Sequence, residues 1–477
     1  MRIQIPFLGP DYANRSSNVN AQKTVNLYPR MQKPGARNAI ALFGTPGLRR
    51  LGVAGTGPWR SNLVEFGGEL YGVSGSALYK INVNLSPTFV GNLSTAGGRC
   101  ELVAGRNYLL VVDGTSGYTY DGTTYAEITD PDFTQTSSGD PASPTHCTYI
   151  GGYFVVNKGG SDEFAISAIE DPTDWDTLDF ATAEAAPDNV LALVATYNSL
   201  YLVGTSTTQV FYQSGNPSFP LDPYPQGTME VGIQAPHSLA KSSAGLFWLA
   251  TTSEGDIAVV RVSGFQSQII SEDIAWDLQQ MSVTDDATGF VYRLEGRVIY
   301  QISFPTEGRT FEYVVDDGTW VERSTYGHDR YIAAGHGYIS NTHLMVNYES
   351  GDYYALDFDV FADNGSPVQR VRRSQHQHSG NHNAVICHEL IVEFEAGVGL
   401  PTGQGEDPQA MLRYSDDGGH TWSSELWRSI GKIGQYQRRA RWTRLGRFRN
   451  RIWELTVSDP VKVVVIDAYA NVTVCNS

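Results

Sequence analysis

The stretch Gly245-Leu-Phe-Trp-Leu-Ala combines a turn glycine with an apolar run whose successive side chains would point to opposite faces of a strand. Similar units recur along the chain, each a turn residue followed by the apolar and aromatic residues typical of strands. Several units run into a second arm closed by a turn dipeptide such as Asp-Gly, so each predicts a hairpin. The other units are Gly67-Gly-Glu-Leu-Tyr-Gly-Val, Gly105-Arg-Asn-Tyr-Leu-Leu-Val-Val, Gly151-Gly-Tyr-Phe-Val-Val, Asn198-Ser-Leu-Tyr-Leu-Val, Gly296-Arg-Val-Ile-Tyr-Gln-Ile and Asn341-Thr-His-Leu-Met-Val.

The spacing of these units predicts the architecture. The seven units begin 38, 46, 47, 47, 51 and 45 residues apart. A period in the mid-forties accommodates four strands, and repeats of about 40 to 50 residues are typical of β-propeller blades. A four-stranded sheet by itself leaves one face exposed to solvent, whereas radial stacking of several such sheets buries both faces of each. We therefore expect a β-propeller over residues 38–370. It has six or seven blades, because a blade split between the chain ends can close the ring.

The two flanking regions lack this repeat. Residues 1–37 have little periodicity and predict an extended N-terminal arm, which needs another surface to order it. Residues 371–383 are polar and predict a linker. Residues 384–477 contain longer strand-like runs and predict a separate C-terminal β-sandwich. The fold class is thus all-β. The best candidate helix covers residues 271–281, with Ser271 as its N-cap.

The composition excludes several classes of protein. Of 477 residues, 49 are glycine, 18% are charged and 41% are hydrophobic, which excludes disorder and long-helix bundles. No apolar run approaches the roughly 18 residues that a membrane-spanning helix needs, so we expect a soluble protein. The four cysteines, Cys100, Cys147, Cys387 and Cys475, form no C-x-x-C pair and are expected to be free thiols.

Charge is distributed unevenly along the chain. The net charge is −17, which argues against coating nucleic acid with the whole surface. Residues 428–451 contain nine basic residues and no acid, so the remainder carries 25 basic and 51 acidic residues, or −26. Arginine pairs with carboxylates and also neutralises phosphates, and of these two uses we favour a protein interface over DNA. The candidate interface residues are Arg438, Arg439, Arg441, Arg444, Arg447, Arg449 and Arg451.

The run Ser415-Asp-Asp-Gly-Gly-His-Thr-Trp fits the S-x-D-x-G-x-T-W pattern of the Asp-box, known from sialidase-like propellers. Its pattern residues are Ser415, Asp417, Gly419, Thr421 and Trp422. Asp417 can accept backbone N–H bonds across a hairpin, Gly419 permits a tight turn, and Trp422 can pack beneath it. The box occurs once in full and outside the propeller, so we interpret it as a structural staple of the fold.

Other chemistry-bearing patterns are weak. His376, His378, His382 and His388 are the densest imidazole group, and alternate histidines on a strand can chelate Zn²⁺ or Ni²⁺. No cysteine or carboxylate completes the set at a characteristic spacing, so no metal site is expected. The sequence also has no phosphate-binding loop, no G-x-S-x-G elbow and no H-E-x-x-H motif. We therefore predict no catalytic residues, no cofactor and no enzymatic activity.

The C-terminal region carries several motifs in order. They are Gly397-Val-Gly-Leu, Asp407-Pro-Gln-Ala-Met-Leu-Arg-Tyr with the Asp-box, Ser429-Ile-Gly-Lys-Ile-Gly-Gln-Tyr, Arg441-Trp-Thr-Arg-Leu-Gly-Arg-Phe-Arg-Asn-Arg and Ser458-Asp-Pro-Val-Lys-Val. Asn26-Leu-Tyr-Pro, Thr45-Pro-Gly-Leu and Phe311-Glu-Tyr-Val-Val-Asp-Asp-Gly-Thr-Trp precede them. Together these stretches resemble the packaged-DNA stabilisation proteins of short-tailed bacteriophages, most specifically at the C-terminus.

The resemblance implies a structural protein of the virion tail, assembled in the host cytoplasm. It implies a tail hub, or nozzle, that forms a homo-hexamer docked below the head-to-tail adaptor protein, retains packaged DNA and extends the ejection channel. It also implies binding sites for tail fibre, spike or needle proteins, and a channel through which DNA passes without sequence-specific binding. In such an assembly the arm of residues 1–37 would become ordered. An Asp-box glycan-active hydrolase and a carbohydrate-binding propeller are the alternatives.

Overall fold

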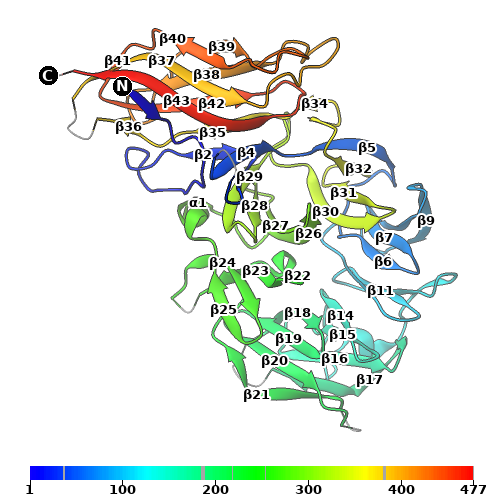
Figure 1. The fold of residues 1–477 in the computed structure, drawn as a ribbon. Coiled ribbons are helices and arrows are strands. Elements are labelled where there is room, and N and C mark those ends of the chain that lie inside the picture. The colour runs from blue at the N-terminus through cyan, green and yellow to red at the C-terminus, as the bar shows by residue number, and fades with distance from the viewer. Residues whose placement is uncertain (36–37, 184–187, 217–218, 253, 380–382, 476–477) are drawn as a thin grey trace.

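The computed structural model describes residues 1–35, 38–183, 188–216, 219–252, 254–379 and 383–475 (Figure 1). Within these ranges almost all of the regular secondary structure is β-strand, as the sequence predicts. The only α-helix in the described ranges is α1 (Ala275–Gln280), and no helix there is long and apolar enough to cross a membrane. α1 follows the short 3₁₀-helix η3 (Glu272–Ile274) inside the predicted helical region. The Ser271 side chain does not cap η3, because its hydroxyl instead accepts a hydrogen bond from the Val259 N–H at 2.9 Å.

Seven four-stranded antiparallel units follow one another in the described chain. The first strands of most neighbouring units contact one another, and the first strand of the last unit contacts the first unit. The first three units are β6 (Val64–Phe66), β7 (Glu69–Ser74), β8 (Ala77–Ile81) and β9 (Pro87–Asn92); β10 (Glu101–Ala104), β11 (Leu109–Val112), β12 (Gly117–Tyr120) and β13 (Tyr125–Glu127); and β14 (Cys147–Ile150), β15 (Tyr153–Asn157), β16 (Glu163–Ala168) and β17 (Asp171–Thr182).

The next three units are β18 (Val190–Thr196), β19 (Ser199–Gly204), β20 (Thr208–Gln213) and β21 (Leu221–Met229); β22 (Ala240–Ser242), β23 (Gly245–Thr251), β24 (Ile257–Ser263) and β25 (Gln266–Ile269); and β26 (Thr288–Leu294), β27 (Arg297–Phe304), β28 (Arg309–Val314) and β29 (Thr319–Arg323). The seventh combines β30 (Ala333–Ile339), β31 (Thr342–Asn347) and β32 (Asp352–Asp357) with β5 (Gly47–Val53) from the N-terminal region. The ring is therefore a β-propeller closed by one split blade, a device that the sequence analysis allowed.

The core of the propeller is divided among the blade interfaces. Seven separate apolar clusters each lie between two neighbouring blades, so every interface has its own core. Strand β23 shows how one run serves two of them. Leu246 and Trp248 belong to the cluster shared with the fourth blade, whereas Phe247 and Leu249 belong to the cluster shared with the sixth. The strand alternation of the opening sequence therefore buries both faces of this blade.

The C-terminal β-sandwich has two sheets. The first contains β1 (Arg2–Gln4), β3 (Leu27–Met31), β4 (Ile40–Gly44), β37 (Val385–Phe394), β40 (Ala440–Thr443), β41 (Arg447–Phe448) and β43 (Val464–Val474). The second contains β2 (Lys23–Val25), β35 (Arg370–Arg373), β36 (Gln377–His378), β38 (Gln409–Ser415), β39 (Leu426–Ser429) and β42 (Asn450–Val457). One apolar core fills the space between them and includes Trp442 and Trp453.

The N-terminal segment lies on the sandwich of its own chain. Strand β1 pairs with β43, and Ile5 and Phe7 are buried in the sandwich core. The Phe7 carbonyl accepts a hydrogen bond of 2.7 Å from Nε of the buried Arg372. The surface that orders this segment is therefore provided by residues more than 300 positions away in the same chain, whereas the sequence analysis expected ordering on assembly.

A continuous sheet joins the two domains. Its strands run in the order β26-β27-β28-β29-β2-β35-β42-β38-β39, so the sixth blade extends into the sandwich. Strand β2 pairs in parallel with β29, with Val25 opposite Glu322, and antiparallel with β35. The start of the stretch expected as a polar linker is thus part of β35, because Arg370 and Arg372 are buried and pair within the sheet. These hydrogen bonds fix the orientation of the propeller against the sandwich.

Two short strands complete the seventh blade at the domain boundary. β33 (Ala362–Asp363) pairs with β34 (Ser366–Pro367) and lies in parallel beside β5.

The described cysteines are free, as predicted from their spacing. Burial raises the pKa of the Cys100 thiol to about 12 and that of Cys387 to about 11, so both are protonated at neutral pH.

Candidate functional site

The five Asp-box residues meet in the turn that follows β38. Ser415 Oγ donates to Asp417 Oδ1 at 2.7 Å and accepts from the Gly419 N–H at 2.8 Å. The Thr421 N–H lies 2.9 and 3.0 Å from the two Asp417 oxygens, and Thr421 Oγ1 donates to Oδ2 at 2.6 Å. Trp422 Nε1 donates to the Gly419 carbonyl at 3.1 Å. Both carboxylate oxygens of Asp417 are therefore engaged in closing the turn.

The Trp422 ring joins this turn to the rest of the sheet. The guanidinium carbons of Arg373 and Arg413 lie 4.8 and 4.9 Å from its ring centroid. Arg373 and Arg413 both form ion pairs with Glu454, which is almost fully buried on β42. Cation–π contacts of this kind contribute about 0.5–1 kcal/mol at exposed sites. Trp422 therefore connects the Asp-box turn at the end of β38 to Arg373 and Arg413 of the same sheet.

We expect Asp417→Asn to lower the melting temperature at neutral pH. Hydrogen bonds from Thr421 and Ser415 hold the pKa of Asp417 well below its usual range. A depressed folded-state pKa gives stability that is present above the unfolded-state pKa of about 3.9 and is lost as the pH falls through the lower folded value. The difference in melting temperature between wild type and variant should therefore be present at pH 7 and shrink in strong acid.

The exposed Asp359 provides the matched control for this prediction. Thermal unfolding of Asp359→Asn should follow that of the wild type at both pH values. A pH-independent deficit of Asp417→Asn would show that the carboxylate charge does not contribute to the turn.

The arginine segment lies on the edge of the sandwich, on β40, β41 and the loops before and after each of them. Six of the seven predicted interface residues are exposed there: Arg438, Arg439, Arg441, Arg444, Arg447 and Arg449. Arg439 Nε lies 3.0 Å from Glu393 Oε1, and Arg441 pairs with Glu389, so part of this charge is balanced within the chain. Arg438 and Arg444 are exposed without a salt bridge to any described acid.

Arg451 does not belong to this surface, which corrects the prediction for that residue. Its side chain is 1% exposed, and its Nε and Nη2 lie 2.6 and 2.7 Å from the two Asp416 carboxylate oxygens. The guanidinium also lies 3.9 Å from the centroid of the Tyr414 ring. Every residue of β42 from Arg451 to Leu455 is buried, so this strand holds Arg451 inside the sandwich and not on its arginine-rich surface.

Large apolar side chains accompany the exposed arginines. Ile433 and Tyr436 lie in the loop between β39 and β40 and are 61% and 75% exposed, and Trp427 on β39 is 51% exposed. Arg428 Nε donates to the Arg441 carbonyl at 2.9 Å, so β39 and β40 meet at this edge. Aromatic residues and arginine are enriched at protein interfaces, where they dominate the binding energy. The surface thus has the composition of a protein interface.

The described members of the predicted imidazole group have separate partners. His376 contacts Asn450 Oδ1 at 3.0 Å and the Ser17 carbonyl at 2.7 Å, and His388 contacts Thr473 Oγ1 at 2.9 Å. His378 lies 3.2 Å from the Ser379 carbonyl, and His382 lies outside the described residues. These histidines therefore serve as hydrogen-bonding groups of the sandwich and its N-terminal segment.

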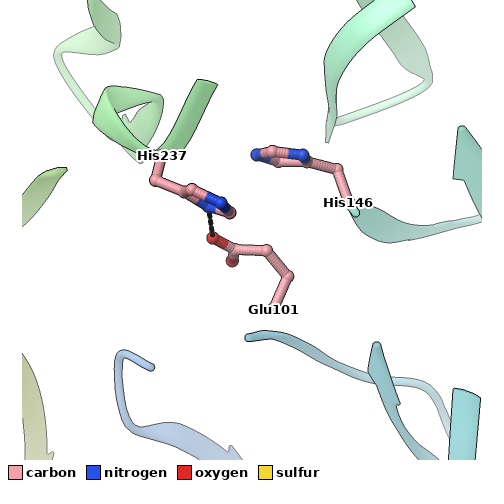
Figure 2. A group of neighbouring side chains, drawn as sticks. All are labelled: Glu101, His146 and His237. Atoms are coloured by element: carbon pink, nitrogen blue, oxygen red, sulfur yellow. Dashed lines mark hydrogen bonds and ion pairs between the residues drawn. The ribbon is translucent and has the colours of Figure 1, made fainter. Parts of the chain in front are cut away.

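A different group of ionisable residues occurs inside the propeller. Glu101, His146 and His237 come from the second blade, the edge of the third and the start of the fifth, and their ligand atoms lie within 4.8 Å of one another (Figure 2). The sequence analysis missed this group. Its members are 45 and 91 residues apart, so no local motif could reveal it.

A cleft lies where the two domains meet. It has a volume of about 440 Å³ and is lined by the N-terminal segment, α1, β29 and the Asp-box turn. Within it, Arg309 forms ion pairs with Asp277 at 2.7 Å and Glu322 at 3.2 Å, and Glu322 also pairs with Lys23 at 3.0 Å. The charged groups of the cleft are therefore largely paired with each other and hold the domain junction together.

Family models match the chain over both domains. A model described as bacteriophage P22 Gp10, beta-propeller, matches residues 3–360, and one described as bacteriophage P22 Gp10, beta-sandwich, matches residues 371–473. The two matches follow the order and approximate bounds of the observed domains. No curated protein matches the chain in sequence.

Among solved structures, the WD40 domain of Neurospora crassa Pan2 is 8% identical with a TM-score of 0.40, covering 63% of this chain and 89% of that one. The extracellular domain of a one-component system from B. thetaiotaomicron is 10% identical with a TM-score of 0.43, covering 80% of this chain and 47% of that one. Both likenesses are remote.

Proposed function

Because the chain belongs to the bacteriophage P22 Gp10 family of phage structural proteins, we propose that it forms the hub, or nozzle, of a short phage tail. In this role it docks below the head-to-tail adaptor, retains packaged DNA and extends the ejection channel. The observation that carries the proposal is the match of both family models, in order, over residues 3–360 and 371–473.

The exposed arginine surface of the sandwich supports docking to a protein partner. It combines uncompensated charge at Arg438 and Arg444 with the exposed rings of Trp427 and Tyr436. The remainder of the chain carries −26, so a second copy or an acidic adaptor offers the complementary charge. The same tail would carry fibre, spike or needle proteins at other surfaces.

The net charge supports passage of DNA without retention on the wall. In a homo-hexamer, six copies at −17 give a total of −102 at neutral pH. DNA carries one negative charge per roughly 1.7 Å of its axis, so acidic walls repel it and favour sliding over binding. Sequence-specific contacts to DNA would oppose ejection, and this role does not require them.

Retention of DNA tests the proposed function. Particles assembled without this chain are expected to package DNA and then lose it, because nothing below the adaptor closes the channel against the self-repulsion of the packaged DNA. Nuclease-protected DNA per particle is the measurement, and purified wild-type chain added during assembly should restore it. Particles lacking only a tail fibre or spike are the control and should keep their DNA. Particles that retain wild-type DNA content without this chain would contradict the proposal.

A further inference from the structure

Three side chains from blades that are not all neighbours converge inside the ring. Glu101 is the first residue of β10 in the second blade, and His146 directly precedes β14 in the third. His237 lies in the 3₁₀-helix η2 (Pro236–Ser238), which leads into the fifth blade. Because the third and fourth blades separate the second from the fifth, these residues can meet only across the interior of the propeller. Figure 2 shows them directed toward a common region.

The distances within this group suit a shared ligand. His237 Nδ1 lies 3.0 Å from Glu101 Oε1, and the His146 and His237 rings have centroids 4.8 Å apart. Ligand atoms bound to one tetrahedral Zn²⁺ lie about 3.4 Å apart, given metal–ligand bonds of about 2.0–2.1 Å. The ligand atoms here lie within 4.8 Å of one another, so small side-chain rotations would bring them to one ion.

The protonation states also suit a metal ion. Burial, with a contribution from His237, lowers the pKa of His146 to about 4, so its imidazole is neutral at physiological pH. Burial alone would raise the pKa of Glu101, but the hydrogen bond with His237 and nearby cationic groups outweigh it and lower that pKa. Neutral imidazole and ionised carboxylate are the forms that bind metals, so protons compete little with a metal ion for His146 and Glu101.

We propose that Glu101, His146 and His237 bind a divalent transition-metal ion, with Zn²⁺ as the best match to two imidazoles and one carboxylate. Three protein ligands of this composition leave a fourth position for water. A cavity of about 410 Å³ lies beside the two histidines and is also lined by Thr145 and Asn157, and it gives the ion a route of entry. Arg99 is the arginine nearest to Glu101 in the sequence, and its Nη1 donates a hydrogen bond of 3.5 Å to the Ala334 carbonyl.

Such an ion would act as a brace across the propeller. Blade interfaces join only neighbouring blades, each through its own apolar cluster. A metal bound by the second blade, the third and the entry to the fifth adds a connection through the centre of the ring. A metal ion that binds only the folded state raises the free energy of unfolding. The increase grows with the ratio of the free metal concentration to the dissociation constant.

Titration of the full-length chain with ZnCl₂, after treatment with EDTA and removal of the chelator, tests this proposal. Calorimetry should give one tight site per chain, and thermal unfolding should shift upward by several degrees at about 100 times the dissociation constant. Glu101→Gln and His237→Ala should each weaken Zn²⁺ binding at least about tenfold and remove the thermal shift. Glu101→Gln preserves side-chain shape, so its effect on binding is separable from misfolding.

Two control variants distinguish this site from other histidines. His328→Gln disrupts a similar pair, in which His328 Nδ1 lies 3.0 Å from Glu349 Oε2. This pair has no third metal-ligating group beside it among the described residues. His376→Gln removes a partly exposed imidazole of the sandwich. Both should bind Zn²⁺ as the wild type does. The proposal is overturned if the wild type shows no site tighter than ~1 mM, if Glu101→Gln and His237→Ala bind normally, or if His376→Gln abolishes binding.

Discussion

Replacing Arg323 with leucine is expected to lower the free energy of unfolding by about 3–5 kcal/mol, because it leaves the buried carboxylate of Glu312 without its counter-charge. Arg323 ends β29, and its side chain is 1% exposed; that of Glu312 on β28 is 0% exposed. Arg323 Nη1 lies 3.5 Å from Glu312 Oε2 and donates to the Tyr28 hydroxyl at 3.1 Å. Urea unfolding followed by circular dichroism gives the measurement.

The surroundings of Glu312 explain the size of this effect. Its two oxygens accept hydrogen bonds from the Tyr28 hydroxyl at 2.5 Å and the Tyr292 hydroxyl at 2.8 Å. Tyr28 comes from the N-terminal β3 and Tyr292 from the sixth blade, so this cluster fastens the N-terminal segment to the propeller. Without Arg323 the carboxylate keeps these neutral donors but loses its only described cation within 4 Å.

Three further variants make this prediction decisive. Glu312→Leu combined with Arg323→Leu removes both charges and should recover much of the loss, as for other buried ion pairs. Glu312→Gln should still destabilise, because the guanidinium then lacks its counter-charge. Arg49→Leu breaks an exposed pair with Asp357 of 3.3 Å and should cost at most about 1 kcal/mol. A loss below about 1 kcal/mol for Arg323→Leu would contradict the assigned role of the cluster.

The combined reversal Arg438→Glu and Arg444→Glu is expected to weaken docking to the head-to-tail adaptor at least about tenfold. These positions are chosen because Arg439 and Arg441 already pair with acids of the same chain, so reversing them would also disturb the sandwich. The reversal changes the surface charge by four units per chain, and a ring of copies repeats the loss at every contact. Binding of purified chain to purified adaptor, at several salt concentrations, measures the effect.

The control for docking is Arg293→Glu, which carries the same kind of charge change to an exposed position on the propeller. It should dock like the wild type, and both proteins should keep the wild-type melting temperature. DNA binding of the double variant should fall less than its adaptor binding. Normal docking of the double variant, or a selective loss of DNA binding, would contradict the interpretation of this surface.

Local patterns were sufficient to predict the propeller. Each hairpin unit encodes its own alternation, as the Leu246-to-Leu249 run shows by serving two blade interfaces at once. Ring closure required one long-range pairing, β5 with β32, which the repeat suggested only as an option. The hydrogen bonds of the Asp-box join residues within four positions of each other, so a local pattern is able to encode them.

Features that depend on distant partners could not be predicted. The N-terminal segment is ordered by contacts such as Arg372 with Phe7, and no sequence spacing encodes that pairing. In the sequence, Arg451 is equivalent to the exposed arginines beside it. Only its contacts with Asp416 and the surrounding aromatic rings distinguish it from them. The group of Glu101 with two histidines likewise exists only because the ring brings three blades together.

The most direct test of the proposed tail role is cryo-electron microscopy of mature, DNA-filled particles. The account predicts a ring below the head-to-tail adaptor into which six copies of the propeller and its fused sandwich fit, in the fixed orientation of Figure 1. A complete tail reconstruction with no density for this chain, in particles whose protein composition also lacks it, would contradict the account.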